Sequence, residues 1–249
     1  MRVVPFFISL SISILVIIGF DFPWGRIPPL GKFLSPQHGF WRNAEAADKD
    51  FSADLHFPYL KDSATVYLDD RMVPHVFVNN ESDAYFIQGW LHAKFRLWQM
   101  EFQVYAAAGR ISELIGSKGL SFDREKRRLG MVYAAEIAVQ EMEKDSTTKA
   151  ECDAYTAGVN AYISGLNESE LPVEYKLLHY QPEKWTNLKT ALFLKYMSLD
   201  LAGGEDDFEY SNARSVFGWS DFEKMYPYAQ DSLDPIVPKG NLYPPPGVT

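Results

Sequence analysis

The sequence predicts an α+β fold, mostly helical, that lies behind an N-terminal membrane anchor. Three observations support it: an uncharged apolar run at the N-terminus, two short β-rich runs near residue 70, and several long helical patterns after them. Two strands are too few to form a layered sheet of their own. The predicted fold is therefore incomplete within this chain.

The composition indicates a folded, acidic protein with a sizeable core. Of 249 residues, 47% are hydrophobic and 15% aromatic, which excludes disorder over most of the chain. The 33 Asp and Glu residues outnumber the 24 Lys and Arg residues, so the formal charge is −9 and no nucleic-acid partner is expected. Cys152 is the only cysteine, which excludes an intrachain disulfide and a cysteine-based zinc site.

Residues 1–22 are interpreted as a transmembrane anchor or a signal sequence. Residues 3–20 carry no charge, and a helix of that length spans roughly 27 Å, close to the hydrocarbon thickness of a bilayer. A signal-peptidase pattern occurs only at Ala44-Glu45-Ala46, too far downstream. We prefer an uncleaved anchor, with a cleaved signal and a buried core helix as alternatives. The first two place the remainder in the periplasm, either tethered to the cell membrane or free.

Residues 23–55 are predicted to form a tether, because prolines and glycines recur through their first half. Four aromatic residues in this stretch have two open interpretations: they lie at the membrane interface, or they pack on the domain. They are Trp24, Phe33, Phe40 and Trp41.

A β-hairpin is predicted next. Residues 64–68 and 73–78 are short β-rich runs on either side of the polar turn Asp69-Asp70-Arg71. Pro74 fits the first position of its strand or an edge, because proline has no N–H to donate to a ladder.

Helices are predicted for most of the remaining chain. Asn79 and Asn80 supply capping side chains for a long helix that ends near Ala108. Its apolar residues cover nearly every face, which is typical of a helix buried in a larger assembly. Further helices are predicted at 110–115, 124–143, 147–166, 187–201 and 207–217, and the proline-rich stretch 235–246 is predicted to be extended.

Three pairs of motifs, in this order, make a specific pattern. They are VPHV at 73–76 with SDAYFIQGWLHA at 82–93, RLWQME at 96–101 with GRISELIG at 109–116, and YTAGVNAYI at 155–163 with QPEKWT at 181–186. The pattern closely resembles the N-terminal (α) chain of the penicillin acylase family of N-terminal-nucleophile hydrolases. One departure is Phe95, where the family has Asp, and we expect it to alter local packing alone.

The resemblance covers residues 56–249 and implies the α-chain half of an αββα sandwich. It implies an amidohydrolase made as a precursor, or zymogen, whose nucleophile is the N-terminal serine of a separate β chain. This chain would then hold no catalytic residue, and the β chain would be its partner. The implied substrates are small N-acyl amides, of the β-lactam or N-acyl homoserine lactone type.

A nucleophile within this chain is not favoured. Ser211-Asn212 is similar to the start of the family's β chain, but the tryptophan expected two residues later is Arg214. An ordinary serine on a surface helix is the preferred interpretation. His75, His92 and His179 belong to no nucleophile motif and are interpreted as core or surface histidines.

An acidic cluster, Glu205-Asp206-Asp207-Phe208-Glu209, has two interpretations. Carboxylates at the start of a helix are favourable against the helix dipole. The resemblance instead implies a structural calcium ion shared with the β chain, with Glu209 as its ligand from this chain. Asp206 or Asp207 is the alternative ligand.

The resemblance also implies a substrate pocket lined by Met197, Asp200 and Leu201. Relatives carry phenylalanine where this chain has Leu201 and arginine where it has Asp200. These differences predict a preference for aliphatic or uncharged N-acyl amides over penicillin G. The alternative is that the three residues form an ordinary helix turn facing the core.

A rival function comes from another class of protein. A membrane-tethered binding or scaffold module, derived from the same family but without catalysis, has the same sequence features.

Overall fold

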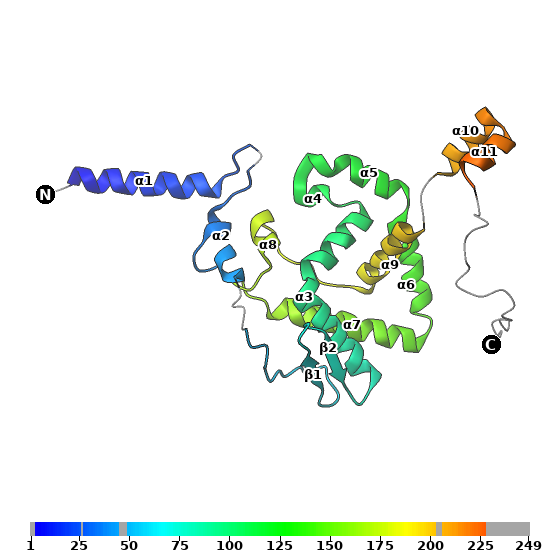
Figure 1. Cartoon of the computed structure of the whole chain (residues 1–249). Coiled ribbons are helices and arrows are strands. Elements are labelled where there is room, and N and C mark those ends of the chain that lie inside the picture. The colour runs from blue at the N-terminus through cyan, green and yellow to red at the C-terminus, as the bar shows by residue number, and fades with distance from the viewer. Residues whose placement is uncertain (1–2, 26, 45–48, 203–205, 228–249) are drawn as a thin grey trace. The chain divides into compact units, whose positions relative to one another are not determined.

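A computed structural model describes residues 3–25, 27–44, 49–202 and 206–227 (Figure 1). The chain divides into two compact units, residues 1–200 and residues 201–249. The described part is mostly helical, as predicted, with one two-stranded sheet.

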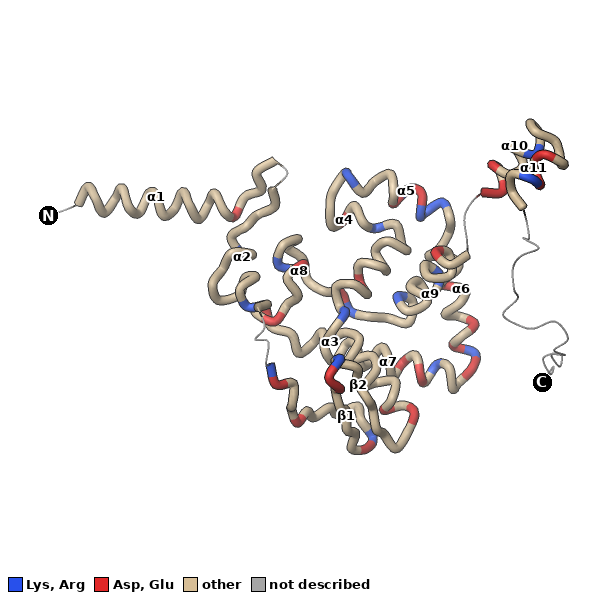
Figure 2. Tube along the Cα trace, in the orientation of Figure 1, with Lys and Arg blue, Asp and Glu red and all other residues tan. Residues whose placement is uncertain are grey.

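The apolar N-terminal run forms one helix, α1 (Val3–Asp21), and none of its residues is buried. Its mean hydropathy is 2.6 over the most apolar window, which is enough to cross a membrane by length and composition. Figure 2 shows no charged residue along α1 until its C-terminal end. Because the helix packs into no core, the core-helix interpretation gains no support from the structure. The helix is consistent with both a membrane anchor and a signal sequence.

Residues 22–44 are called the linker segment below, and their described part (22–25 and 27–44) is folded rather than extended. Trp24 and Ile27 pair through two backbone hydrogen bonds of 3.0 Å. Two short helices follow, α2 (Gly31–Leu34) and the 3₁₀ helix η1 (Phe40–Asn43), and both contact α8 (Val173–Leu178). The first half of the predicted tether is therefore part of the folded domain, held there by residues more than a hundred positions away.

The predicted hairpin is confirmed as strands β1 (Thr65–Leu68) and β2 (Pro74–Phe77), which pair antiparallel with Leu68 opposite Pro74. The Asp69 carboxylate closes the turn, since it accepts hydrogen bonds from the N–H groups of Arg71 (2.9 Å) and Val73 (2.8 Å). Pro74 begins its strand, where a missing N–H is tolerated.

The long helix α3 (Glu81–Ala108) is confirmed, with Asn80 as its N-cap and Gly109, at φ 63°, as its C-cap. It packs along α7 (Ser146–Gly165), and glycines set how closely the two helices approach. A Cβ atom on Gly158 would lie 1.9 Å from the carbonyl oxygen of Phe86, and one on Gly89 would lie 2.2 Å from that of Tyr155. These two positions therefore admit no side chain.

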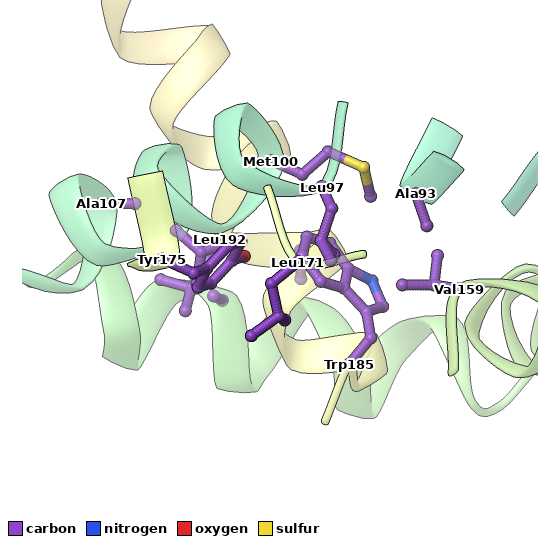
Figure 3. Close-up of a cluster of buried hydrophobic side chains, with 12 residues drawn as sticks. Ala93, Leu97, Met100, Ala107, Val159, Leu171, Tyr175, Trp185 and Leu192 are labelled. Atoms are coloured by element: carbon purple, nitrogen blue, oxygen red, sulfur yellow. The ribbon is translucent and has the colours of Figure 1, made fainter. Parts of the chain in front are cut away.

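The core lies between α3, α6, α7, α8 and α9 (Asn187–Leu201) (Figure 3). Leu97, Met100 and Val104 of α3 meet Val159 of α7 there. Burying one such side chain contributes about 1.5–3 kcal/mol relative to exposing it. The other members are Ala93, Ala107, Ala135, Leu171, Tyr175, Trp185, Ala191 and Leu192.

The segment between α3 and α7 departs from the prediction. One helix was expected over 124–143, but the structure has α5 (Leu120–Arg128) and α6 (Met131–Met142). The break falls at Gly130, whose φ of 67° is left-handed and ends a right-handed helix. Before α5 lie α4 (Ser112–Ile115) and the 3₁₀ helix η2 (Gly116–Gly119).

The second unit contains α10 (Asp207–Phe217), as predicted, and α11 (Trp219–Met225), which was not predicted. Neither helix has a buried residue. The rings of Tyr210, Phe222 and Tyr226 contact one another across the pair, with centroids 5.2–6.2 Å apart, and only Phe222 and Tyr226 are stacked. The extended stretch predicted over 235–246 lies outside the described residues.

Candidate functional site

The three residues predicted to contact substrate lie on the last turns of α9. Met197 and Leu201 are four positions apart and so share one face of the helix, with Asp200 beside them. Met197 is 42% exposed and Leu201 is 75% exposed. Within the described residues, the apolar side chains of this turn are therefore exposed.

The start of α9 is held firmly by α7. The amide of Asn160 accepts a hydrogen bond from the Trp185 N–H (2.8 Å) and donates one to the Trp185 carbonyl (3.0 Å). Trp185 is buried, and its indole N–H donates to the Thr190 hydroxyl at 3.0 Å. The motifs at 155–163 and 181–186 thus serve to position α9.

A buried charge cluster beneath α9 fixes it to α3. Glu101, 1% exposed, accepts hydrogen bonds from the Tyr175 hydroxyl (2.6 Å), the Glu183 N–H (2.7 Å) and the Lys189 ammonium (3.4 Å). Burial raises the pKa of the Glu101 carboxyl, and these hydrogen bonds oppose the rise. The carboxylate joins α3, α8 and α9 at one point.

Glu183 completes the same cluster. It accepts hydrogen bonds from Arg110 (2.7 Å) and the Tyr105 hydroxyl (3.0 Å), and its second oxygen lies 3.0 Å from the Lys189 ammonium. Hydrogen bonds from Arg110 hold the pKa of Glu183 at about 2. Two carboxylates and two cations meet here, which is an arrangement that fixes helices and supplies no nucleophile.

The predicted calcium ligands lie in the second unit. Glu209 and Asp207 are in the first turn of α10, and Asp206 precedes it, with all three side chains exposed. Carboxylate oxygens are donors suited to calcium, which takes about 6–8 of them. The described residues contain no group of three His, Cys, Asp or Glu placed to hold a metal. Glu205 lies outside the described residues.

The histidines and Ser211 are spread over separate elements. His75 of β2 lies 3.5 Å from the Asp69 carboxylate, and the His92 Nδ1 atom of α3 lies 3.0 Å from the Tyr155 hydroxyl. His179 ends α8 in a left-handed conformation, and Ser211 lies exposed inside α10. The second unit, which holds Ser211, contains no histidine in its sequence.

Sequence reasoning missed the charge cluster, although the motifs contained most of its members. Glu101 ends the motif at 96–101, Arg110 lies in that at 109–116, and Glu183 lies in that at 181–186. Their partners are 73 to 88 residues apart along the chain. A single sequence offers no signal for such pairing.

The sequence of this chain is similar to that of a known protein family. A family model described as penicillin amidase matches residues 63–240, which is more than half of the chain. Penicillin acylase 2 proenzyme from Pseudomonas sp. (strain SE83) is 36% identical over 141 residues, which are 57% of this chain and 18% of that protein. Acyl-homoserine lactone acylase QuiP from Pseudomonas aeruginosa is 32% identical over 130 residues, 52% of this chain and 15% of that protein. The matched region thus spans less than a fifth of these relatives.

A solved structure has the same fold. Thermostable penicillin G acylase from Alcaligenes faecalis, in its tetragonal form, matches with a TM-score of 0.58 at 20% identity. The match covers 71% of this chain and 97% of the chain in that structure. At this identity the likeness concerns the fold alone.

Proposed function

Because the chain belongs to the penicillin amidase family, we propose that it is the N-terminal, non-nucleophilic part of an amidohydrolase acting on N-acylated small molecules. The observation that carries the proposal is the family match over residues 63–240. The relatives differ in the substrate that their names give: one is a penicillin acylase and another is an acyl-homoserine lactone acylase. What their named compounds share is an amide bond between an acyl group and a small amine.

In this proposal the chain is a scaffold that presents α9 to a second chain. The serine nucleophile, its amine base and the oxyanion-hole donors belong to the β chain of the same precursor. The relative from Pseudomonas sp. is likewise named as a proenzyme. The β chain also adds strands to the two-stranded sheet, to build an αββα sandwich. The exposed end of α9 supports this role, because a scaffold must leave uncovered the surface that its partner completes.

Met197, Asp200 and Leu201 select the substrate in this proposal. Leu201 offers an aliphatic wall where an aromatic ring would add about 0.5–1.5 kcal/mol for a phenylacetyl group. Asp200 repels a carboxylate such as that of the penicillin nucleus. Met197 is flexible and adapts to acyl chains of varied shape. We therefore propose aliphatic or uncharged N-acyl amides as the preferred substrates.

Calcium is proposed as a structural ion between the two chains, with Glu209 as one ligand and Asp206 or Asp207 as the alternative. The exposed carboxylates fit a hard cation, and the remaining ligands belong to the β chain. In the assembled protein, Glu209→Gln removes one charged ligand and lowers the calcium retained after dialysis. Unchanged calcium content would assign the ligand to another carboxylate.

We also propose that α1 stays attached as a single-pass anchor, with the folded part in the periplasm. Its uncharged length supports this proposal. N-terminal sequencing of the mature protein tests it, and a new terminus between residues 20 and 47 would mean a cleaved signal.

The activity is tested by assaying the chain alone and together with the polypeptide encoded downstream of codon 249. We expect hydrolysis of a medium-length N-acyl homoserine lactone by the pair and none by the single chain. A downstream frame that begins Ser-Asn-x-Trp supports the proposal. Absence of any activity in a well-folded pair would favour the membrane-tethered scaffold instead.

The substrate preference has its own variant. In the assembled enzyme, Asp200→Arg is expected to raise kcat/KM for penicillin G relative to the N-acyl homoserine lactone. An unchanged ratio would remove Asp200 from the pocket.

A further inference from the structure

Two hydrogen-bonding side chains, Lys176 and Asn43, fix the linker segment (residues 22–44) to the core, and the Asn43 amide donates to the Leu171 carbonyl at 2.9 Å. Lys176 of α8 is 6% exposed, and its ammonium donates to the Asn43 side-chain oxygen (2.6 Å) and to the carbonyls of Ser169 (2.9 Å) and Gly39 (3.2 Å). All three acceptors are neutral oxygens, and the Glu168 carboxylate acts on the ammonium only through its charge. Burying a cation costs free energy, which its hydrogen bonds must offset. The Lys176 ammonium therefore depends on the oxygens of Asn43 and Gly39, and this dependence holds the segment in one place.

The linker segment also lies close to the end of α1. The Trp24 indole N–H donates to the Gly19 carbonyl at 2.6 Å, and the Trp24–Ile27 bridge folds the chain back. From Asp21 at the end of α1 to Gly31 at the start of α2, even a fully extended chain reaches only roughly 35 Å. Helices α1 and α2 are also in contact, so a bilayer that holds α1 has the start of the linker segment close to its surface.

The aromatic side chains of the linker segment divide into two groups. Phe33 and Phe40 stack on each other with ring centroids 4.9 Å apart and are half-buried. Trp24 and Trp41 are 66% and 63% exposed, and the ring of Trp41 also contacts that of Phe40, with centroids 4.4 Å apart. The other exposed apolar residues of the segment are Phe22, Ile27 and Leu34. Tryptophan is enriched at membrane–water interfaces, because its amphipathic ring suits the headgroup layer. Exposed tryptophans close to a membrane helix fit that environment.

The charge of the linker segment is opposite to that of the whole chain. Residues 22–44 contain two arginines and one lysine and no acidic residue, whereas the chain carries −9. Figure 2 shows basic and no acidic positions along the described part of the segment. Basic side chains close to a bilayer are attracted to anionic headgroups.

We propose that the linker segment is a membrane-contact surface. Trp24 and Trp41 lie in the headgroup layer with the basic side chains, and the Lys176 ammonium ties the core to them, so the domain has one orientation on the bilayer. The occupant of this surface is a lipid headgroup layer that contains anionic lipid. The inference rests on retention of α1 in the proposed function.

The test uses the full 249-residue chain reconstituted into vesicles of phosphatidylcholine and phosphatidylglycerol. In a Cys152→Ser background, a spin label is placed through Trp41→Cys or, as the control, through Tyr133→Cys, which is 70% exposed on α6. Relaxation of the label by oxygen, which enters lipid, is compared with relaxation by a water-soluble nickel chelate. We expect a lipid-like ratio at position 41 and a water-like ratio at position 133.

A water-like ratio at position 41, equal to that at 133, would overturn the proposal. Protection of position 41 from both agents would also overturn it, because protein and not lipid would then cover the surface. Vesicles of phosphatidylcholine alone test the charge: the lipid-like ratio at 41 is expected to weaken without the anionic lipid.

A second measurement addresses the role of Lys176. With labels at both 41 and 133, we expect a single narrow distance, lost in Lys176→Met and kept in Lys184→Met, whose side chain is exposed. A distance that stays narrow in Lys176→Met would remove the lysine from the proposal. If that variant fails to fold, the ratio at position 41 in the parent chain still decides whether lipid is contacted.

These outcomes are separate from those of the proposed function. Missing amide hydrolysis would leave both label measurements unchanged. N-terminal sequencing that shows a cleaved α1 would end the anchor proposal before vesicles are used.

Discussion

The two ends of α9 differ in what surrounds them. At the start, Lys189, Ala191 and Leu192 are buried against α3 and the charge cluster. At the end, Met197 and Leu201 are largely exposed. Helix α9 therefore runs from the buried core to an exposed surface. The motifs that resemble the penicillin amidase family belong mostly to the buried part, where their residues hold the helices together.

The largest loss of folding stability is expected when Glu101, in the buried cluster at the start of α9, is replaced. Glu101→Ala leaves the Lys189 ammonium, the Tyr175 hydroxyl and the Glu183 N–H without their shared acceptor. Removing one partner of a buried pair costs about 3–5 kcal/mol. Urea unfolding of the chain measures it, with Glu113→Ala as the control, because that carboxylate is exposed and its pair contributes about 0–1 kcal/mol. Equal losses for the two variants would contradict a buried cluster.

The next effect tests the approach of α3 and α7. Gly158→Ala places a Cβ atom 1.9 Å from the Phe86 carbonyl oxygen, so the helices must separate. Overpacking of this kind costs about 1–3 kcal/mol. Gly165→Ala, in the last turn of the same helix, has no atom within 4 Å of its Cβ and should be neutral or stabilising by up to about 1 kcal/mol. Thermal unfolding of the two variants compares them, and a stable Gly158→Ala would mean that the helices lie further apart.

A pH dependence follows from Glu183. Hydrogen bonds from Arg110 lower its pKa from 4.5 to about 2, so the folded state favours the ionised carboxylate. The stability gained is complete above about pH 4.5 and is lost as the pH falls toward 2. We expect about 1 kcal/mol, because the group is partly exposed and water screens its charge.

The free energy of unfolding is measured against pH for the parent and for Glu183→Gln. Burial raises the pKa of Glu101, which acts in the opposite direction, so the difference between the two curves isolates Glu183. Parallel curves between pH 2 and pH 4.5 would contradict the assigned pKa.

The smallest effect is expected at the exposed end of α9. Leu201→Ala removes a side chain that is 75% exposed, so the stability of the chain should change by less than about 0.5 kcal/mol. Leu192→Ala, in the buried half of the same helix, should cost about 2–5 kcal/mol. Thermal unfolding of both variants checks this. A large loss for Leu201→Ala would show that the end of α9 packs within this chain.

Local patterns predicted much of the fold, and distant contacts limited the rest. Asn80 as a cap and the alternation around Pro74 led to α3 and the hairpin at almost their observed bounds. The break at Gly130 was missed, because a glycine inside a helical pattern costs only about 1 kcal/mol and its left-handed φ leaves no mark on the sequence. The folded linker segment was missed for another reason, since its anchor, Lys176, lies more than 130 residues away.

The candidate site was predicted less completely than the fold. Resemblance alone pointed to Met197, Asp200, Leu201 and Glu209, and the structure shows all four exposed, with no group of three metal-ligating side chains among the described residues. The periodicity of apolar residues does not distinguish a helix end that packs on the core of its own chain from one whose apolar side chains stay exposed. That distinction depends on what surrounds α9 in the folded protein.

Hydrogen exchange along α9 tests the central claim most directly. In the chain alone, backbone amides from about 191 to 194 should exchange slowly, because the buried cluster and core hold that half. Amides from about 198 to 201 should exchange quickly, and should become slow when the second chain is added. Uniformly slow exchange along α9 in the single chain would contradict the account, because the end of the helix would then need no partner.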